Sequence, residues 1–498
     1  MTRVYIRTLL GAGAVFASVA GPAAVQAVAP FPLGVYVGNA NGNDPKAMAD
    51  FKAAFDAHNA KMGGVRPKFF NVFTDFGKDP STWPKNAAWG AWSSAKSGDA
   101  YLGPGSGMIP LVGVPLATNS GGWSKVDTFY LDTIAGKYDA AWAGIVDGWA
   151  GAGYKVIDFR IAYEMNGNFM PWAPGNSKAP NARQDFVKAF QHVADILHRE
   201  AKAKGAQAFV HWNPAGISYT GYDITLLYPG DAYVDVISAD QYSPMYPRDL
   251  TDWAHGGKTR LTDKAAWAAD PLNREHFWRQ PNGSFNEPNP KIGAWGWSVP
   301  MTIQFAKQHG KPMAIDETGA GPSGSGLGPH DDPEFPRVLA AILHDAQAQG
   351  VTVRNVNIWD AKLGDGDWDF RGGSKPLAAA AWAKYFGSGG SAVPYTPPPA
   401  PAASPARPTA RSAAVTPPRA SGKMSVVVGQ SLAAPGKIVL VRGGSDLSSW
   451  AKASPAAPIR VKVGGHDYLV VGAGNGRLIF STPVAPADAK WGSTIVGN

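Results

Sequence analysis

The 498-residue chain contains no cysteine, which excludes disulfide bonds and thiolate metal sites. The cysteine count therefore gives no information about the cellular compartment. Long hydrophobic runs are also scarce, and beyond the N-terminal region none is long enough to cross a bilayer. Runs of Lys and Arg are missing too, although the net charge is +8. Because diffuse positive charge is typical of a solvated surface, we expect no nucleic-acid partner.

The N-terminus has the three parts of a secretory signal peptide. Arg3 and Arg7 precede the apolar residues 9–20, and small residues lead to Ala27. The apolar run is short for a membrane span, so an uncleaved anchor is the weaker alternative. We therefore predict a signal peptide at residues 1–27, a secreted or periplasmic protein, and no membrane insertion after cleavage.

Eight strand-like segments alternate with helix-like ones between residues 30 and 386. Apolar residues recur at helical spacing in residues 183–204 and 334–349. Eight β-then-α units predict an α/β fold, a (β/α)8 TIM barrel. The strand candidates are residues 33–38, 68–74, 108–115, 156–163, 208–212, 234–239, 312–316 and 353–359.

The composition changes after the predicted barrel. Residues 387–423 are rich in Pro, Ala and Ser, which is typical of a semi-extended linker. Residues 424–498 contain short β-rich runs between Gly, Asp and Asn turns, which predict a small all-β module. The sequence does not indicate the role of this module.

Two glutamates lie at ends of predicted strands. Glu164 ends the fourth strand and Glu317 ends the seventh. Active sites of such barrels form at the carboxyl ends of the strands, and cleavage of a glycosidic bond normally requires two carboxyl groups. We therefore predict that both glutamates are catalytic. The alternative is a pair of salt bridges at the rim.

Other residues near these strand ends support a sugar site. In the fourth strand Asp158, Arg160 and Glu164 share one face, and charge inside a barrel is rarely tolerated unless it serves a site. Tyr242 can donate a hydrogen bond to Glu317, and Trp359 can form the floor of a sugar site. For the aromatic residues, core or rim packing is the alternative. The further candidates are Phe169, Trp172, Trp212 and Asp240.

The chain resembles glycoside hydrolase family 26, best known for β-mannanases, over about residues 33–386. The most specific segment runs from Phe159-Arg160 through Glu164-Met165-Asn166-Gly167 to Trp172. The first strand, Leu33-Gly34-Val35-Tyr36, and the seventh, Lys311-Pro312 through Glu317-Thr318-Gly319, are similar as well.

This resemblance implies roles for several residues. Glu164 would be the acid/base, Glu317 the nucleophile, Tyr242 its hydrogen-bond partner and Trp359 the sugar platform. Residues of the Arg160 to Trp172 segment, Tyr163 and Asn166 among them, would contact substrate. The implied reaction needs no metal and no organic cofactor, and the expected partner of the monomeric chain is a polysaccharide.

Three positions depart from the family's usual residues. Tyr163 stands where His usually precedes the acid/base, Phe169 stands where a Trp is common, and residues 112–115 replace a Trp-His pair. The substrate is therefore left open among β-mannan, mixed-linkage β-glucan, β-1,3-xylan and a bacterial exopolysaccharide.

Two further alternatives remain at this point. Asp365, Asp367 and Asp369 form an acidic cluster after the eighth strand, which fits a calcium loop but is more typical of a solvated turn. The other reading of the whole chain is a non-catalytic carbohydrate-binding or cell-wall protein on a barrel scaffold. Such a protein would have no use for both glutamates.

Overall fold

The computed structural model describes residues 29–388 except 78, 119–125, 217–221, 244–245, 248–249, 280–296, 322–327 and 364–365, and six strands between residues 424 and 497. The chain divides into two compact units after Pro401, and each is described by itself. The predicted signal peptide at residues 1–27 and most of the predicted linker at residues 387–423 lie outside the described residues.

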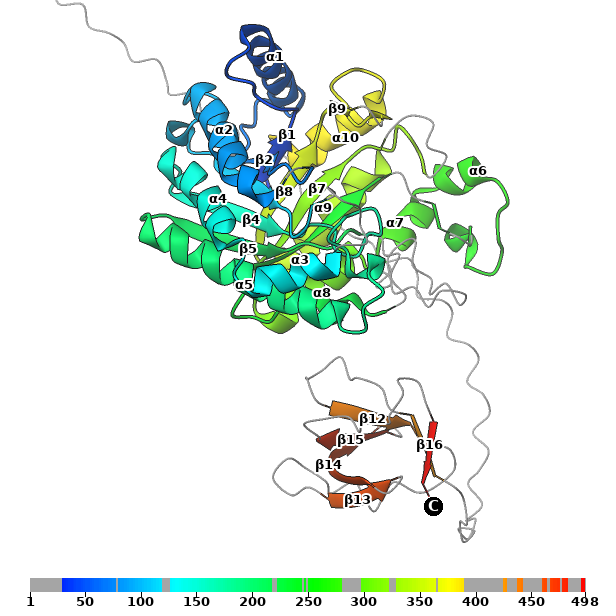
Figure 1. Ribbon diagram of the computed structural model, residues 1–498. Coiled ribbons are helices and arrows are strands. Elements are labelled where there is room, and N and C mark those ends of the chain that lie inside the picture. Colours follow the sequence, from blue (N-terminus) through cyan, green and yellow to red (C-terminus); the bar gives the residue numbers. More distant parts are fainter. Residues whose placement is uncertain are drawn as a thin grey trace, which may run out of the picture. The chain divides into compact units, whose positions relative to one another are not determined.

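The first unit contains a closed barrel of eight parallel strands that pair in sequence order, with β1 next to β8 (Figure 1). This confirms the predicted (β/α)8 barrel and all eight strand positions to within a few residues. The strands are β1 Leu33–Tyr36, β2 Phe69–Phe73, β3 Ile109–Val114, β4 Val156–Ile161, β5 Gln207–Trp212, β6 Val236–Tyr242, β7 Met313–Gly319 and β8 Val353–Trp359.

Helices lie around this barrel (Figure 1). In α5 the buried residues Phe186, Phe190, Val193 and Leu197 recur at helical spacing, so one apolar face packs against the strands. The helices are α1 Pro45–Lys61, α2 Trp83–Lys96, α3 Val126–Ile134, α4 Asp139–Gly151, α5 Ala182–Ala203, α6 Lys264–Ala269, α7 Pro271–Arg279, α8 Val299–His309, α9 Glu334–Ala348 and α10 Pro376–Phe386. No helix in the described part of the chain is long and apolar enough to cross a bilayer.

The interior of the barrel is polar, whereas barrel interiors are commonly filled by Val, Ile and Leu. Its buried polar residues come from six strands and from the residue after β5, and most of them hydrogen-bond one another across the barrel. They are Asn71, Asp158, Arg160, His211, Asn213, Ser238, Asp240, Asp316, Asn355 and Asn357. A buried polar interior is stable only if its groups are hydrogen-bonded, so it fixes the strands in one arrangement.

Two register shifts let successive residues face this interior. Between β6 and β7, Ala239 pairs with Ile315 but Asp240 pairs with Glu317, so β7 has one extra residue. A shift in the β7–β8 pairing likewise adds one residue to β8 between Val353 and Val356. Side chains of a regular strand alternate between its faces, and a bulge re-aims them.

In the second unit the described strands form two antiparallel sheets. The backbone of β11 Met424–Val427 pairs with that of β16 Thr494–Gly497. The second sheet has the order β12-β15-β14-β13, with β12 Lys437–Val441, β15 Arg477–Ser481, β14 His466–Gly474 and β13 Ile459–Val463. A complete all-β module over residues 424–498 stays a prediction.

Candidate active site

A left-handed backbone turn presents Glu164 at the end of β4. The strand ends at Ile161, earlier than expected, and both Ala162 (φ 49°) and Glu164 (φ 54°) have positive φ. Neighbouring backbone groups hold the turn, because Ala162 N donates to Val114 O at 2.8 Å and Glu164 N donates to Asn213 O at 2.7 Å. Non-glycine residues rarely adopt this conformation, and such strain is concentrated at functional sites.

The carboxyl group of Glu164 is half-buried and favours its neutral form. Among the described residues, no hydrogen bond or ion pair engages this carboxyl. Burial and the charge of Glu317 raise the pKa of Glu164 to about 8, against the opposing effect of Arg160. At neutral pH, Glu164 therefore carries a proton that it can donate.

Glu317 at the end of β7 has the opposite environment. Its carboxyl accepts a hydrogen bond from Tyr242 Oη at 2.7 Å and lies 2.7 Å from Arg160 Nη1. Each oxygen therefore faces one donor, the arrangement expected of an ionised carboxylate. The side chain stays slightly exposed at 7% for the whole residue, which leaves it accessible to a ligand.

Arg160 is wholly buried and links three strand ends. Its Nη2 lies 2.6 Å from Asp240 Oδ2, and its Nε donates to Asn213 Oδ1 at 2.7 Å. Burial lowers the pKa of Arg160, but the carboxylates of Asp240, Glu317 and Asp316 outweigh it and raise the pKa. The guanidinium is therefore a fixed positive charge beneath Glu317.

Aromatic rings line the same end of the barrel. The Tyr36 and Trp359 rings lie 4.2 Å apart, and Phe73 lies 5.3 Å from Tyr163 and 5.7 Å from Trp359. Gly113 of β3 makes this packing possible, because a Cβ there would meet Phe73 Cδ1 at 2.6 Å. Burial and the charge of Glu317 raise the pKa of Tyr36 to about 12, so its hydroxyl stays protonated.

Several predicted residues support this site from behind. Trp172 is buried edge-on against Tyr163, with ring centroids 4.7 Å apart, and its Nε1 donates to Tyr163 O at 2.7 Å. The Asn166 amide exchanges two hydrogen bonds with the backbone of Ala215. These residues and Asp240, which is paired with Arg160, hold the site without lining it. Phe169 is 42% exposed.

Trp212 does not join this group, so our expectation for it was wrong. Its neighbour His211 faces the barrel interior, and alternation along β5 turns Trp212 outward. There it is wholly buried, with its ring 5.4 Å from that of Phe305 on α8 and its Nε1 donating to Leu227 O. Trp212 is a core residue.

Two residues near the site were not singled out as site residues from the sequence. Tyr36 and Phe73 end β1 and β2. Their position at strand ends was the available signal, because every carboxyl end of a barrel strand faces the same rim.

The described residues contain no group of three His, Cys, Asp or Glu side chains placed to hold a metal ion. The acidic cluster after β8 is described only in part, because Asp365 lies outside the described residues. Of its other members, Asp367 accepts a hydrogen bond from Ser374 Oγ at 3.0 Å.

One protein family matches part of the sequence that forms the barrel. The sequence model of glycosyl hydrolase family 26 matches residues 151–266, which carry Arg160, Glu164 and Tyr242. Endoglucanase H of Acetivibrio thermocellus is 32% identical over 124 residues, which make up 24% of this chain and only 13% of that protein. Glu317 lies outside the matched segment.

Solved structures with similar coordinates include two endo-β-1,4-mannanases. A double mutant from Cellulomonas fimi has a TM-score of 0.41 at 18% identity, over 91% of this chain and 87% of the other. The enzyme from Thermotoga petrophila has a TM-score of 0.41 at 12% identity, over 90% and 91% of the two chains. These TM-scores are low, so we assign the fold from the strand pairing of this chain and not from these structures. The match at residues 151–266, set in an eight-stranded parallel barrel, confirms the resemblance of this chain to glycoside hydrolase family 26.

Proposed function

We propose that this protein is a secreted retaining glycoside hydrolase that cleaves a β-linked polysaccharide. The observation that carries the proposal is the difference between the two carboxyl groups. Glu317 accepts from Arg160 and Tyr242, while Glu164 has a pKa of about 8 and no partner among the described residues. Two carboxyls whose surroundings favour opposite protonation states are the acid and nucleophile pair of this chemistry.

The reaction proceeds in two displacements. Glu317 attacks the anomeric carbon while Glu164 transfers its proton to the departing glycosidic oxygen, which breaks the glycosidic bond and leaves a glycosyl-enzyme ester. Glu164, now ionised, removes a proton from water, and the resulting attack at the anomeric carbon releases Glu317. Each substitution inverts the carbon, so the product keeps the β configuration.

The aromatic rings of Tyr36, Tyr163 and Trp359 support a sugar substrate. Flat apolar faces stack on the C–H faces of sugar rings, and Tyr hydroxyls provide hydrogen bonds. β-Mannan is the first candidate, because the chain resembles glycoside hydrolase family 26, which is best known for β-mannanases. Tyr163 and residues 112–115 depart from the residues that the family tends to have, which favours testing β-glucan, β-xylan and exopolysaccharides alongside it.

The test is a panel of mannan, mixed-linkage glucan, xylans and bacterial exopolysaccharides, with wild type and Glu317→Ala side by side. We expect wild type to cleave at least one polymer, with a β-anomer as the first product seen by proton NMR. A product of inverted configuration would contradict the double displacement. Tight binding without cleavage by wild type would instead support the non-catalytic carbohydrate-binding alternative.

Secretion and independence of the barrel are tested separately. N-terminal sequencing of protein from the medium or periplasm should find a start after Ala27 or Ala29, and recovery of the intact chain with Met1 from the cytoplasm would contradict export.

A chain truncated after Ser388, whose Oγ donates to Gly63 O, should fold and hydrolyse soluble polymer. An insoluble or inactive truncated chain would show that the second unit belongs to the catalytic fold.

A further inference from the structure

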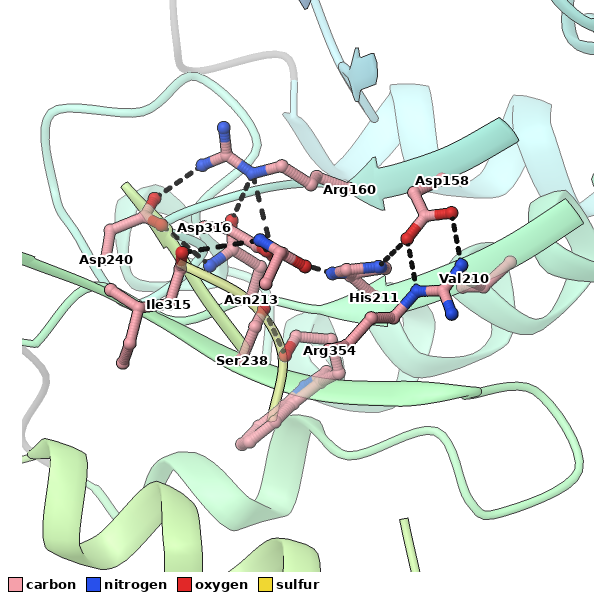
Figure 2. A network of polar contacts seen from close by, with 12 residues as sticks. Asp158, Arg160, Val210, His211, Asn213, Ser238, Asp240, Ile315, Asp316 and Arg354 are labelled. Atoms are coloured by element: carbon pink, nitrogen blue, oxygen red, sulfur yellow. Dashed lines mark hydrogen bonds and ion pairs between the residues drawn. The ribbon is translucent and has the colours of Figure 1, made fainter. Parts of the chain in front are cut away.

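Charged side chains of alternating sign cross the barrel interior (Figure 2). Arg354 of β8 donates to Asp158 of β4, with 2.5 Å from Nε to Oδ2 and 2.7 Å from Nη2 to Oδ1. His211 of β5 lies between Asp158, 2.9 Å from its Nε2, and Asp316 of β7, 2.8 Å from its Nδ1. Asp316 in turn lies 3.9 Å from Arg160 Nε. The charges lead to the guanidinium that holds Glu317.

Counting hydrogen-bond partners in this network favours an imidazolium at His211. A neutral imidazole has one N–H, but both ring nitrogens of His211 are within hydrogen-bond distance of a carboxylate oxygen. Asp158 already accepts two hydrogen bonds from Arg354, and Asp316 Oδ1 accepts from Asn355 Nδ2 at 3.0 Å. Both carboxyls are thus surrounded by donors, which favours a histidine that donates from both ring nitrogens.

The electrostatics of the buried groups agree with this count. Burial lowers the pKa of His211, but attraction to Asp316 and hydrogen bonds to both aspartates outweigh it and raise the pKa to about 9. Burial raises the pKa of Asp316, whereas His211 and Arg160 lower it to about 2. Across the mildly acidic to neutral range, the pair is an imidazolium and a carboxylate.

We propose that His211 is a positioning residue that is held as an imidazolium and acts through Asp316 and Arg160 on Glu317. The proposal rests on the assignment of Glu317 as the nucleophile. Asp316 sits below the guanidinium, so its charge must be balanced from the other side for Arg160 to stay engaged with Glu317. Without the positive charge of His211, Asp316 would compete with Glu317 for Arg160.

The other charged groups around the network leave this task to His211. Arg354 donates two hydrogen bonds to Asp158. Asp240 of β6 occupies the far side of Arg160, with its Oδ2 2.6 Å from Nη2. Burial raises the pKa of Asp240, and Arg160 opposes this while Glu317, Glu164 and Asp316 add to it. His211 lies at hydrogen-bond distance from Asp316, 2.8 Å, whereas Arg160 Nε lies 3.9 Å from it.

The protonation state is tested first, in a way that does not depend on turnover. Protein labelled with 15N in histidine is compared with His211→Gln, whose missing signals identify the residue. We expect both nitrogens of His211 to carry protons at pH 7 and to lose one near pH 9. A neutral His211 at pH 7 would overturn the proposal.

The action on the nucleophile is tested by kinetics. We expect His211→Gln to lower kcat about 10-fold, with a small change in KM, and to move the acidic limb of kcat/KM to higher pH. Adding Asp316→Asn to this variant removes the unbalanced charge and should return the limb toward its original pH. A limb unmoved in His211→Gln, or unmoved by the second substitution, would show that His211 serves stability alone.

His58→Gln is the matched control. His58 is also wholly buried, and its Nδ1 lies 2.8 Å from Asp360 Oδ2, but α1 carries it outside the barrel interior. We expect this variant to lose stability while its acidic limb stays in place. An equal shift in His58→Gln would remove the specific role of His211.

A crystal structure of His211→Gln separates this inference from the proposed function. Failure of wild type to cleave any polymer in the panel counts against the function, whereas the NMR and the variant structure still decide the inference. We expect Arg160 Nη1 to have moved away from Glu317 Oε1. An unchanged Arg160–Glu317 pair would overturn it.

Discussion

The ends of β4 and β7 each present one glutamate, but they do so by different backbone routes. β4 stops at Ile161 and a left-handed turn carries Glu164 out of the strand, while β7 continues through Glu317 with one extra residue. The turn leaves Glu164 without a partner among the described residues, and the bulge places Glu317 against Arg160. Identical side chains thus acquire opposite chemistry from their surroundings.

We expect the largest effect on activity when the nucleophile is removed. Glu317→Ala should reduce kcat by about 10⁴-fold or more, because the covalent step is lost. Activity on the cleaved polymer and the melting temperature are measured together. A folded variant that keeps full activity would rule out Glu317 as the nucleophile.

The next largest effect is expected at the guanidinium that distinguishes the β7 end. Arg160→Lys keeps the charge but cannot reach Glu317, Asp240 and Asn213 at once. We expect kcat to fall about 10²- to 10³-fold and the free energy of unfolding to fall by about 3 kcal/mol. Steady-state kinetics and urea unfolding measure both, and retention of both values would show that Arg160 contributes nothing beyond its charge.

At the β4 end, the raised pKa of Glu164 predicts a pH-dependent cost to stability. Its pKa of about 8 lies above the ordinary value of 4.5, so the folded state resists ionisation and loses stability as pH rises between these values. Glu164→Gln should raise the free energy of unfolding by about 1–3 kcal/mol at pH 8 and hardly at pH 4.5. Glu334→Gln on α9 is the control for loss of a glutamate. Equal effects of Glu164→Gln at both pH values would contradict the assignment.

The smallest expected effect concerns the backbone turn itself. Ala162 has a φ of 49° and no exposed surface, so Ala162→Gly relieves strain and should raise stability by up to about 1 kcal/mol. The same change at Ala208, inside β5, should lower stability by about 0.5–1 kcal/mol. Thermal unfolding compares the two variants. Equal losses in both would mean that the turn at β4 stores no strain.

The positions of the strands were predictable because their apolar runs and their alternation with helices are local features. Glu164 and Glu317 were predictable for a related reason, since a strand end in a barrel faces the common rim. Trp212 was misplaced although its neighbour decides the outcome. Once His211 is known to face inward, the two-residue period of a strand turns Trp212 outward.

The buried network was not predictable, because it depends on register. The shift between β6 and β7 lets Asp316 and Glu317 both reach Arg160. The shift at β8 lets Arg354 reach Asp158 and Asn355 reach Asp316. A bulge depends on pairing between distant strands and leaves no local pattern. Asp158 and Arg160 alone carried a hint, because two charges on one strand face imply partners inside the barrel.

The different roles of Glu164 and Glu317 are tested most directly by the pH dependence of kcat/KM. Wild type and Glu164→Ala are compared on a substrate with a good leaving group. In the wild type the value should fall as pH rises through about 8, where Glu164 loses its proton. In Glu164→Ala this basic limb should disappear, because the group that titrates is gone, while the good leaving group keeps the rate measurable. A basic limb that survives in the variant would contradict the assignment of Glu164 as the acid.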